Sequence, residues 1–108
     1  MDKEIVPIII DLNAAANGEM NESFLEMFGG AIEMLLGKMF GYNSNPVILR
    51  GTNKQIKNFA GVLNGEKKYM DAYEKYGLSD PKTYSSKHSL DKAIAKFEKS
   101  TGIKYPIK

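Results

Sequence analysis

The sequence predicts a helix-dominated α+β fold that forms a single domain over residues 1–108. Two short runs at 4–12 and 46–50 are rich in β-branched residues and have strand character. Longer segments repeat apolar residues at spacings of three and four, which is typical of helices. The length of 108 residues matches the commonest domain size, and 43% hydrophobic content is enough for an ordinary core. We expect the order strand, helix, strand and then three helices.

The first strand is expected within the run EIVPIIIDL at residues 4–12. Pro7 cannot donate to a neighbouring strand, so it indicates the start or an edge of this strand. The small and polar residues 13–19 predict a connection. Asp11 follows the strand, where acids of parallel-sheet enzymes can lie. Without a second catalytic residue, we expect Asp11 to be a turn or cap residue.

The longest apolar repeat predicts a helix over residues 22–40, with Asn21 as its N-cap. Its apolar face is formed by Phe24, Phe28, Ile32, Leu35 and Met39. The Gly29-Gly30 pair is unfavourable inside a helix and indicates a kink or a close backbone approach. Because this helix is apolar on most sides, it either lies in the centre of the core or is shared with another subunit.

The run PVILR at residues 46–50 predicts the second strand. Two strands that are joined through a helix are parallel if they pair directly. A sheet of two strands is only marginally stable and needs helices packed against it. Dimerisation of two such sheets would relieve the same weakness.

The second half begins with two predicted helical segments. Thr52 and Gln55 have the spacing of a capping box at the start of the first segment. Asn64-Gly65 is a turn signal, so we expect the helix to break or bend there. The second segment covers about residues 66–76, and Gly77 suits the position that follows its end.

The last helix is predicted over residues 89–101, after a loop at 78–88 that is rich in Ser, Pro and Lys. Ser89 is its expected N-cap. Gly102 is expected to end the helix, and Ile103 is placed for the hydrophobic contact of a Schellman cap.

Charge divides the chain at its middle. Residues 1–50 carry seven acids and three bases, a balance of −4, and residues 51–108 carry twelve lysines and six acids, a balance of +6. The two balances sum to the net charge of +2. A basic half with tyrosines among its lysines is suited to an acidic partner.

One hypothesis for this basic half is weak, sequence-independent nucleic-acid binding. Lysines interleaved with aromatic residues are typical of surfaces that bind single strands. The lysines expected to contact phosphates are Lys54, Lys67, Lys68, Lys92, Lys96 and Lys99. Two facts weaken this hypothesis. Arginine, the commoner reader of bases, occurs once in the chain, and the pI of about 8.7 is below the range of strongly basic binding domains. The alternative is a solvated lysine surface without a partner.

The leading hypothesis is a small interaction or structural module, without enzymatic activity, that forms a homo-oligomer. The residues expected to mediate self-association are Met27, Phe28, Met34, Leu35 and Met39. Flexible methionine-rich surfaces bind partner helices, although methionine also fills cores. Binding through such an apolar surface should change little with salt, whereas phosphate binding should weaken steeply.

The sequence gives no support for an enzyme, a metal or a cofactor. It contains no Ser-His-Asp, HExxH or GxSxG motif, and His88 is its single histidine, which we expect to be solvated. Gly51-Thr52 lies between a strand and a helix, where a phosphate can bind, but the capping box already accounts for Thr52.

An acidic stripe on the 22–40 helix has two interpretations. Glu22, Glu26 and Glu33 are expected to form a solvated surface. The alternative is a hydrolytic or metal-dependent enzyme that uses these carboxylates with Asp11. That alternative requires the four side chains to converge in one pocket.

The composition also predicts where the protein is found. The chain has no cysteine and no apolar run long enough to cross a bilayer, and at its start two acids flank a single lysine. We therefore expect a cytoplasmic protein that does not associate with membranes.

Three stretches of the second half carry a resemblance: VILRGTNKQIKNF at 47–59, YGLSDPKTY at 76–84 and FEKSTGIKYP at 97–106. Together they resemble small uncharacterised proteins encoded by tailed bacteriophages of marine bacteria. The resemblance covers about the second half of the chain. It implies a viral accessory or structural protein made in a bacterial cytoplasm, and it brings no catalytic residues.

Overall fold

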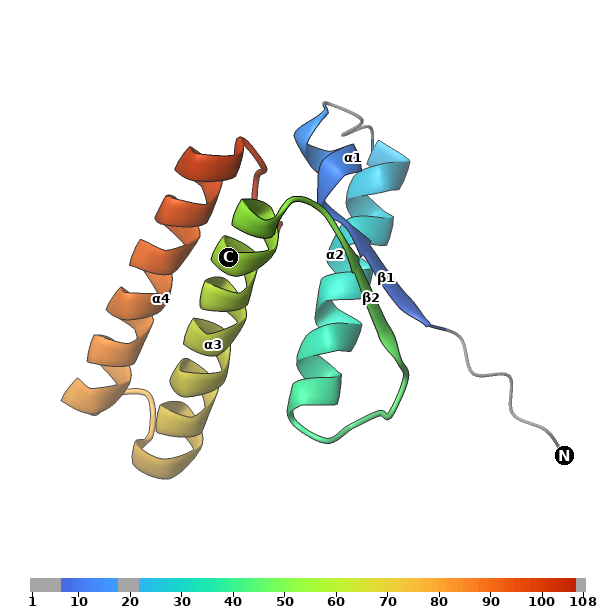
Figure 1. Cartoon of the computed structure of the whole chain (residues 1–108). Helices are drawn as coiled ribbons and strands as arrows, with labels where there is room; N and C mark the ends of the chain where they lie inside the picture. Colours follow the sequence, from blue (N-terminus) through green and yellow to red (C-terminus); the bar gives the residue numbers. More distant parts are fainter. Residues whose placement is uncertain (1–6, 18–21, 107–108) are drawn as a thin grey trace, which may run out of the picture.

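The computed structural model describes residues 7–17 and 22–106 and confirms the helix-dominated α+β class. The elements in order are β1 (Ile8–Asp11), α1 (Leu12–Ala16), α2 (Glu22–Met39), β2 (Val47–Arg50), α3 (Asn53–Tyr76) and α4 (Pro81–Thr101). The sequence of strand, helix, strand and C-terminal helices agrees with the prediction (Figure 1). The boundaries differ at three places, and each difference has a local cause.

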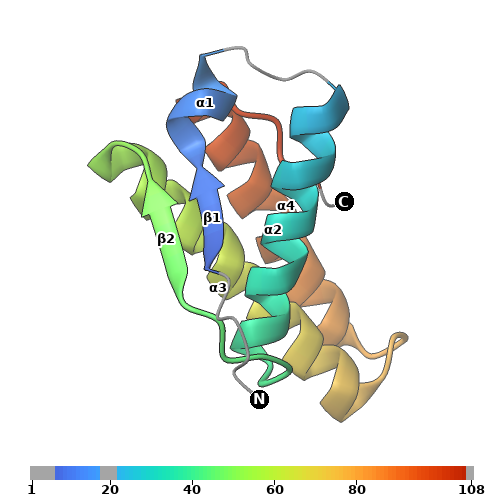
Figure 2. The same ribbon diagram turned by 90° about the vertical axis from the view of Figure 1, so that its right-hand side faces the viewer.

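The elements form two layers. Figure 2 shows β2, β1 and α2 side by side in front, with the antiparallel hairpin of α3 and α4 behind them. The core lies between the layers and includes Ile8, Ile10, Leu12, Phe28, Ile32, Phe59, Val62, Leu90, Ile94 and Phe97. Both layers contribute to this one core, as expected for a single domain.

The two strands pair in parallel, as predicted for strands that are joined through a helix and pair directly. The register runs from Ile8 opposite Val47 to Asp11 opposite Arg50. Successive side chains of a strand point to opposite faces, so the sheet has an inner and an outer face. The inner face belongs to the core, whereas no described element covers the near face of the strands in Figure 2.

A short helix, α1, replaces part of the connection predicted at 13–19. Asp11 caps it, because the Asp11 Oδ1 atom accepts a hydrogen bond from the Ala14 backbone N–H at 3.0 Å. Leu12 and Ala15 of α1 are buried, so packing stabilises this single turn of alanine-rich helix. The cap role predicted for Asp11 is confirmed, and the N-cap predicted at Asn21 lies outside the described residues.

The helix break predicted at Asn64-Gly65 is wrong, because α3 continues through both residues. A Cβ atom placed on Gly65 would lie 3.3 Å from the Leu90 Cα atom of α4. The glycine therefore permits a close crossing of two helices rather than ending one. The predicted capping box is confirmed, with bonds of 3.1 Å from Gln55 N to Thr52 Oγ1 and 2.8 Å from Thr52 N to Gln55 Oε1.

The loop predicted at 78–88 and the N-cap predicted at Ser89 are also wrong. Helix α4 begins eight residues earlier, at Pro81 (89 − 81 = 8). Asp80 is the true N-cap, because its Oδ1 atom accepts a hydrogen bond from the Lys82 backbone N–H at 2.8 Å. Proline suits the first helical turn, where its missing N–H would have no partner in the helix.

A short turn joins α3 to α4. Gly77 ends α3 as predicted, with a φ of 83° that favours glycine. Thr83 is buried, and its hydroxyl group donates to the Gly77 carbonyl at 2.6 Å and lies 3.2 Å from the Ala72 carbonyl. This side chain ties the first turn of α4 to the last turn of α3.

The C-terminal residues return to the core after Gly102 ends α4 at a φ of 74°, as predicted. Ile103 and Tyr105 are almost completely buried between the two layers. The Tyr105 ring meets the Phe97 ring edge-on, with centroids 6.4 Å apart. A Cβ atom on Gly29 of α2 would contact the Pro106 side chain at 3.7 Å, so the tail bridges both layers.

Candidate functional site

The outer surface of the α3–α4 hairpin carries exposed lysines from both helices. We name the following set the lysine face: Lys54, Lys57, Lys68, Lys75, Lys92, Lys96 and Lys99. Lys57 is two positions from buried Phe59, which is about 200° around the helix. Lys99 has the same relation to buried Phe97. Since the buried residues face the front layer, the lysine face lies on the opposite side of the hairpin.

The structure separates Lys67 from the other five lysines proposed as phosphate contacts. The Lys67 ammonium group lies 3.2 Å from the Asp71 Oδ2 atom and 5.5 Å from the centre of the Phe40 ring. Phe40 follows the end of α2, so Lys67 points toward the front layer. Lys68, its neighbour in sequence, belongs to the lysine face.

An exposed tyrosine lies among lysines at the turn end of the hairpin. The ammonium groups of Lys75 and Lys82 lie 5.3 and 4.5 Å from the centre of the Tyr76 ring. A hydrogen bond with Lys75 and the charges of Lys75 and Lys82 lower the pKa of Tyr76. Cations over an aromatic ring interact with its π electrons, so this ring is held in a strongly positive environment.

A hollow of about 290 Å³ lies beside this turn and is lined by Tyr69, Leu78, Thr83, Tyr84 and Lys87. Tyr84 is 64% exposed, and Leu78 is also exposed. The Lys87 ammonium group lies 5.9 Å from the centre of the Tyr69 ring. Tyr84 lies in the stretch 78–88 that was predicted as a loop, so helical spacing could not relate it to Tyr69.

The front layer presents a second, apolar surface. We name Ile9, Ile48, Met27 and Met34 the open apolar face; they are 45%, 40%, 72% and 44% exposed. Ile9 and Ile48 are register partners on the two strands, and Ile9 and Met27 line one common hollow. Met27 and Met34 are seven residues apart, close to two helical turns, and so share one side of α2.

The residues proposed for self-association are therefore divided. Met27 and Met34 are exposed, whereas Phe28 and Leu35 are buried in the core and Met39 is partly buried. Leu35 lies in the core, and Phe28 meets the surface only where it lines the hollow beside Met27. The periodicity alone identified an apolar helix but not which of its sides faces the hairpin.

The hollow on the open apolar face has a volume of about 260 Å³. Its lining residues are Ile9, Asp11, Ala14, Phe24, Met27 and Phe28. Asp11 is the one ionisable residue among them, and its carboxylate caps α1. The chemistry of this hollow favours apolar contact rather than proton transfer.

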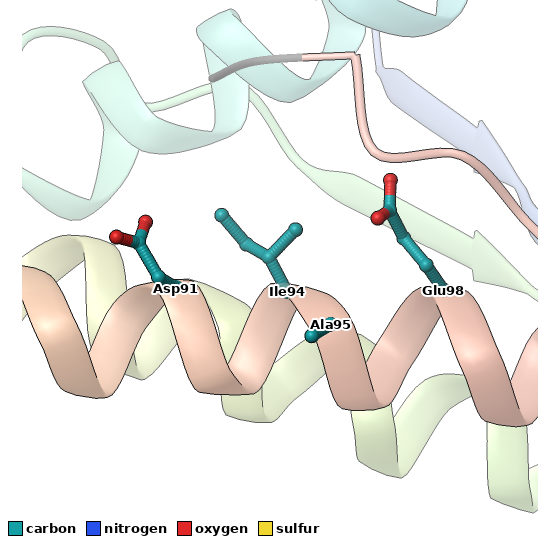
Figure 3. Close-up of a pocket in the computed structure, with 4 residues that line it drawn as sticks. All are labelled: Asp91, Ile94, Ala95 and Glu98. Atoms are coloured by element: carbon teal, nitrogen blue, oxygen red, sulfur yellow. The ribbon is translucent and has the colours of Figure 1, made fainter.

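A further hollow of about 260 Å³ lies along α4 and is lined by Asp91, Ile94, Ala95 and Glu98. Figure 3 shows Asp91, Ile94 and Glu98 projecting from the same side of the helix. Asp91 pairs with Lys87 at 2.6 Å, and Glu98 accepts the Tyr105 backbone N–H at 2.9 Å. Both carboxylates are thus engaged in contacts that stabilise the fold.

The two described carboxylates of the acidic stripe do not gather at Asp11. Glu26 and Glu33 are exposed on α2, and neither lines the hollow that contains Asp11. The side chain of Glu22 lies outside the described residues. Within the described part of the chain, no group of three or more His, Asp or Glu residues has the arrangement of a metal site. His88 is exposed on α4.

A partly buried polar pair connects the hairpin to the tail. The Tyr105 hydroxyl group lies 3.0 Å from the Glu66 Oε1 atom, to which it donates. Burial raises the pKa of Glu66, although the bond from Tyr105 and the charge of Lys87 oppose this effect. Burial and the neighbouring Glu66 charge raise the pKa of Tyr105. The pair serves packing, because neither group lines one of the three hollows described above.

Comparisons with known proteins add no relative: no family model, curated protein or solved structure matches this chain. Among the described residues, none of the helices combines the length and the apolar character that crossing a bilayer requires. The functional interpretation therefore depends on the two surfaces described above.

Proposed function

We propose that this protein is a non-enzymatic interaction module that forms a homodimer through its open apolar face. The observation that carries the proposal is the exposure of four large apolar side chains on adjoining elements of one layer. Contiguous exposed apolar surface is unusual in a monomer and typical of interaction sites. A second copy of the chain is the occupant that also relieves the weakness of a two-stranded sheet.

The charges around this face support a symmetric pair. Arg50 shares the outer face of β2 with Ile48, since side chains two apart on a strand point the same way. On α2, Glu26 directly precedes Met27 and Glu33 directly precedes Met34. These two acids therefore flank the edge of the open apolar face that is opposite to Arg50. When a two-fold axis parallel to the strands relates the two copies, Arg50 of one copy approaches Glu26 and Glu33 of the other.

The dimer has a direct test in light scattering coupled to size-exclusion chromatography. The wild-type protein is expected to have the mass of a dimer at both low and high salt, because apolar contacts are insensitive to screening. Ile48→Lys and Met27→Lys are expected to be folded monomers, since both changed side chains are exposed. A wild-type monomer at every concentration tested would refute the proposal.

A matched control separates the open apolar face from a general effect of added charge. Leu78→Lys places the same new side chain on another exposed apolar residue, at the turn of the hairpin. This variant is expected to remain a dimer. If it becomes a monomer as readily as Ile48→Lys does, the interface lies elsewhere.

Two expectations from the sequence belong to the same proposal. The resemblance to small proteins of tailed bacteriophages supports an accessory or structural role in an infected bacterium. The absence of cysteine is compatible with the cytoplasm as the site of action. Detection of the protein in the cytosolic fraction of infected cells, or its absence there, tests both expectations.

A further inference from the structure

We propose that the α3–α4 hairpin binds a single-stranded polynucleotide, with phosphates on the lysine face and bases against the tyrosines at its turn. This binding site is separate from the open apolar face, because the two surfaces belong to different layers. Binding of a polynucleotide can therefore be tested independently of dimerisation.

The lysine face can follow a strand over several nucleotides. Lys57, Lys68 and Lys75 are separated by eleven and seven residues, close to three and two turns of one helix. They extend over about 27 Å of α3 at 1.5 Å per residue. Lys92, Lys96 and Lys99 form a second row on the adjoining helix. Two rows of ammonium groups make a track for a phosphate backbone.

The acids of the hairpin neutralise this track only in part. Asp71 is three residues after Lys68 and four before Lys75 on the same helix, and Glu74 is exposed next to Lys75. Asp71 is engaged with Lys67, and Asp91 is engaged with Lys87. Glu66 approaches the core, where it accepts from Tyr105. The electrostatic potential of the outer side is thus set mainly by lysine, so phosphate binding there should depend strongly on salt.

The tyrosines at the turn supply the stacking surfaces that lysines lack. Tyr76 lies directly beside the lysine face, and the Lys75 and Lys82 ammonium groups over its ring must move aside when a base stacks there. Tyr84 is 64% exposed in the first turn of α4, next to the turn of the hairpin. Aromatic rings stack on unpaired bases of any sequence, and nearby ammonium groups can hold the adjoining phosphates.

These observations favour a single strand over other anionic partners. A duplex keeps its bases stacked inside, so the tyrosines would gain nothing from it. Anchoring on a lipid surface requires a broad apolar side on the same helix. On the lysine face the described side chains are charged rather than apolar, and Leu78 alone extends the hollow with an aliphatic group.

The test is fluorescence anisotropy of labelled oligo(dT) and oligo(U), measured over a series of salt concentrations. Both strands are expected to bind wild type, with an affinity that falls linearly on a logarithmic salt scale. The competitors are a duplex of equal length and phosphatidylserine vesicles. Equal or tighter binding of either competitor would overturn the single-strand assignment.

The neighbouring lysines Lys67 and Lys68 give a matched pair of variants. Lys68→Gln removes a charge from the lysine face and is expected to weaken binding and reduce the salt slope by about 0.7. Lys67→Gln makes the same chemical change on a lysine that points to Phe40 and Asp71, and it is expected to weaken binding less than Lys68→Gln does, only through the charge of the released Asp71. Equal effects of the two variants would show nonspecific attraction and contradict the proposed track.

The stacking contribution has its own variants. Tyr76→Ala and Tyr84→Ala are each expected to weaken binding by about 5- to 150-fold if the ring stacks on a base. Tyr42→Ala changes an exposed tyrosine beyond the end of α2 and is the control. Circular dichroism establishes that each variant is folded. If neither turn variant changes the affinity, the tyrosines do not stack on bases and that part of the proposal is wrong.

Discussion

The α3–α4 hairpin and the β1–α1–α2–β2 layer are stabilised in different ways. The hairpin has side-chain caps at the start of each helix, glycines at each end and direct packing of one long helix on the other. The front layer has two strands of four residues each and depends on the core it shares with the hairpin. Local sequence thus specifies the hairpin, whereas distant contacts specify the front layer.

The same two regions also present different surfaces. The outer side of the hairpin is rich in lysine, whereas the front layer exposes apolar residues flanked by acids. This difference corresponds to the division of charge along the chain between residues 1–50 and 51–108. One domain can therefore offer two independent surfaces to partners of different chemistry.

The largest effect is expected from Phe97→Ala, because Phe97 is a hairpin residue in the core that both regions share. Its ring lies 5.8 Å from the Phe59 ring and 6.4 Å from the Tyr105 ring, measured between centroids. We expect unfolding to become easier by about 3–5 kcal/mol, with the hairpin and front layer lost together. Chemical denaturation followed by circular dichroism measures this change.

Phe97→Leu is the companion variant, because a protein of ordinary stability can fail to fold after the larger truncation. It is expected to unfold in a single transition at lower denaturant than wild type. Two separate transitions in either variant would show that the layers fold independently.

The next effect distinguishes two glycines of α3. Gly65→Ala adds a methyl group that would lie 3.3 Å from the Leu90 Cα atom, so we expect a loss of about 1–3 kcal/mol. Gly61→Ala adds the same group in open space and should stabilise the helix by about 1 kcal/mol. Thermal denaturation of the two variants makes the comparison, and equal stabilisation in both would rule out the close crossing.

A smaller effect is expected at the N-cap of α4. Asp80→Ala removes the side chain that accepts the Lys82 backbone N–H and should lower stability by about 1 kcal/mol. Asp80→Asn retains an acceptor at the same place and should change stability much less. Hydrogen exchange of the first turn of α4 reports the loss locally. No difference between these variants would indicate a helix that starts after Asp80.

The smallest effect concerns pH and the Glu66–Tyr105 pair. Because burial raises the pKa of Glu66, its ionisation is less favourable in the folded state than in the unfolded state. Its contribution to stability is therefore fully present below the unfolded pKa, about 4.3, and is lost as pH rises through the folded pKa. Glu66→Gln removes this loss while its amide oxygen can still accept from Tyr105.

Urea denaturation at a series of pH values tests this sign. The unfolding free energy of Glu66→Gln, relative to wild type, is expected to rise from about pH 4 toward neutrality. A difference that stays constant with pH, or falls, would contradict the burial of Glu66.

Much of the fold could be predicted from local signals in the sequence. The capping box of Thr52 and Gln55 and the helix-ending roles of Gly77 and Gly102 were correct because each depends on a few adjacent residues. Gly65 was misinterpreted because a glycine that permits a helix crossing has the same local appearance as one in a turn. Asp80 followed by proline carried the start signal of α4, but the polar composition of residues 78–88 obscured it.

The candidate surfaces were predictable to different degrees. Helical spacing was enough to predict that Lys92, Lys96 and Lys99 share an exposed stripe. Spacing could not separate buried Phe28 from exposed Met27, because that depends on where the hairpin packs against α2. Burial of Tyr105 was likewise invisible in the sequence, because its partner Glu66 is 39 residues away.

The most direct test of two independent surfaces is light scattering coupled to size-exclusion chromatography, at low and high salt, with and without oligo(dT). A dimer at both salt concentrations is expected, with oligo(dT) adding to its mass at low salt only. A monomer at both salt concentrations would contradict the apolar interface. Dimerisation that requires the oligonucleotide would contradict the independence of the two surfaces.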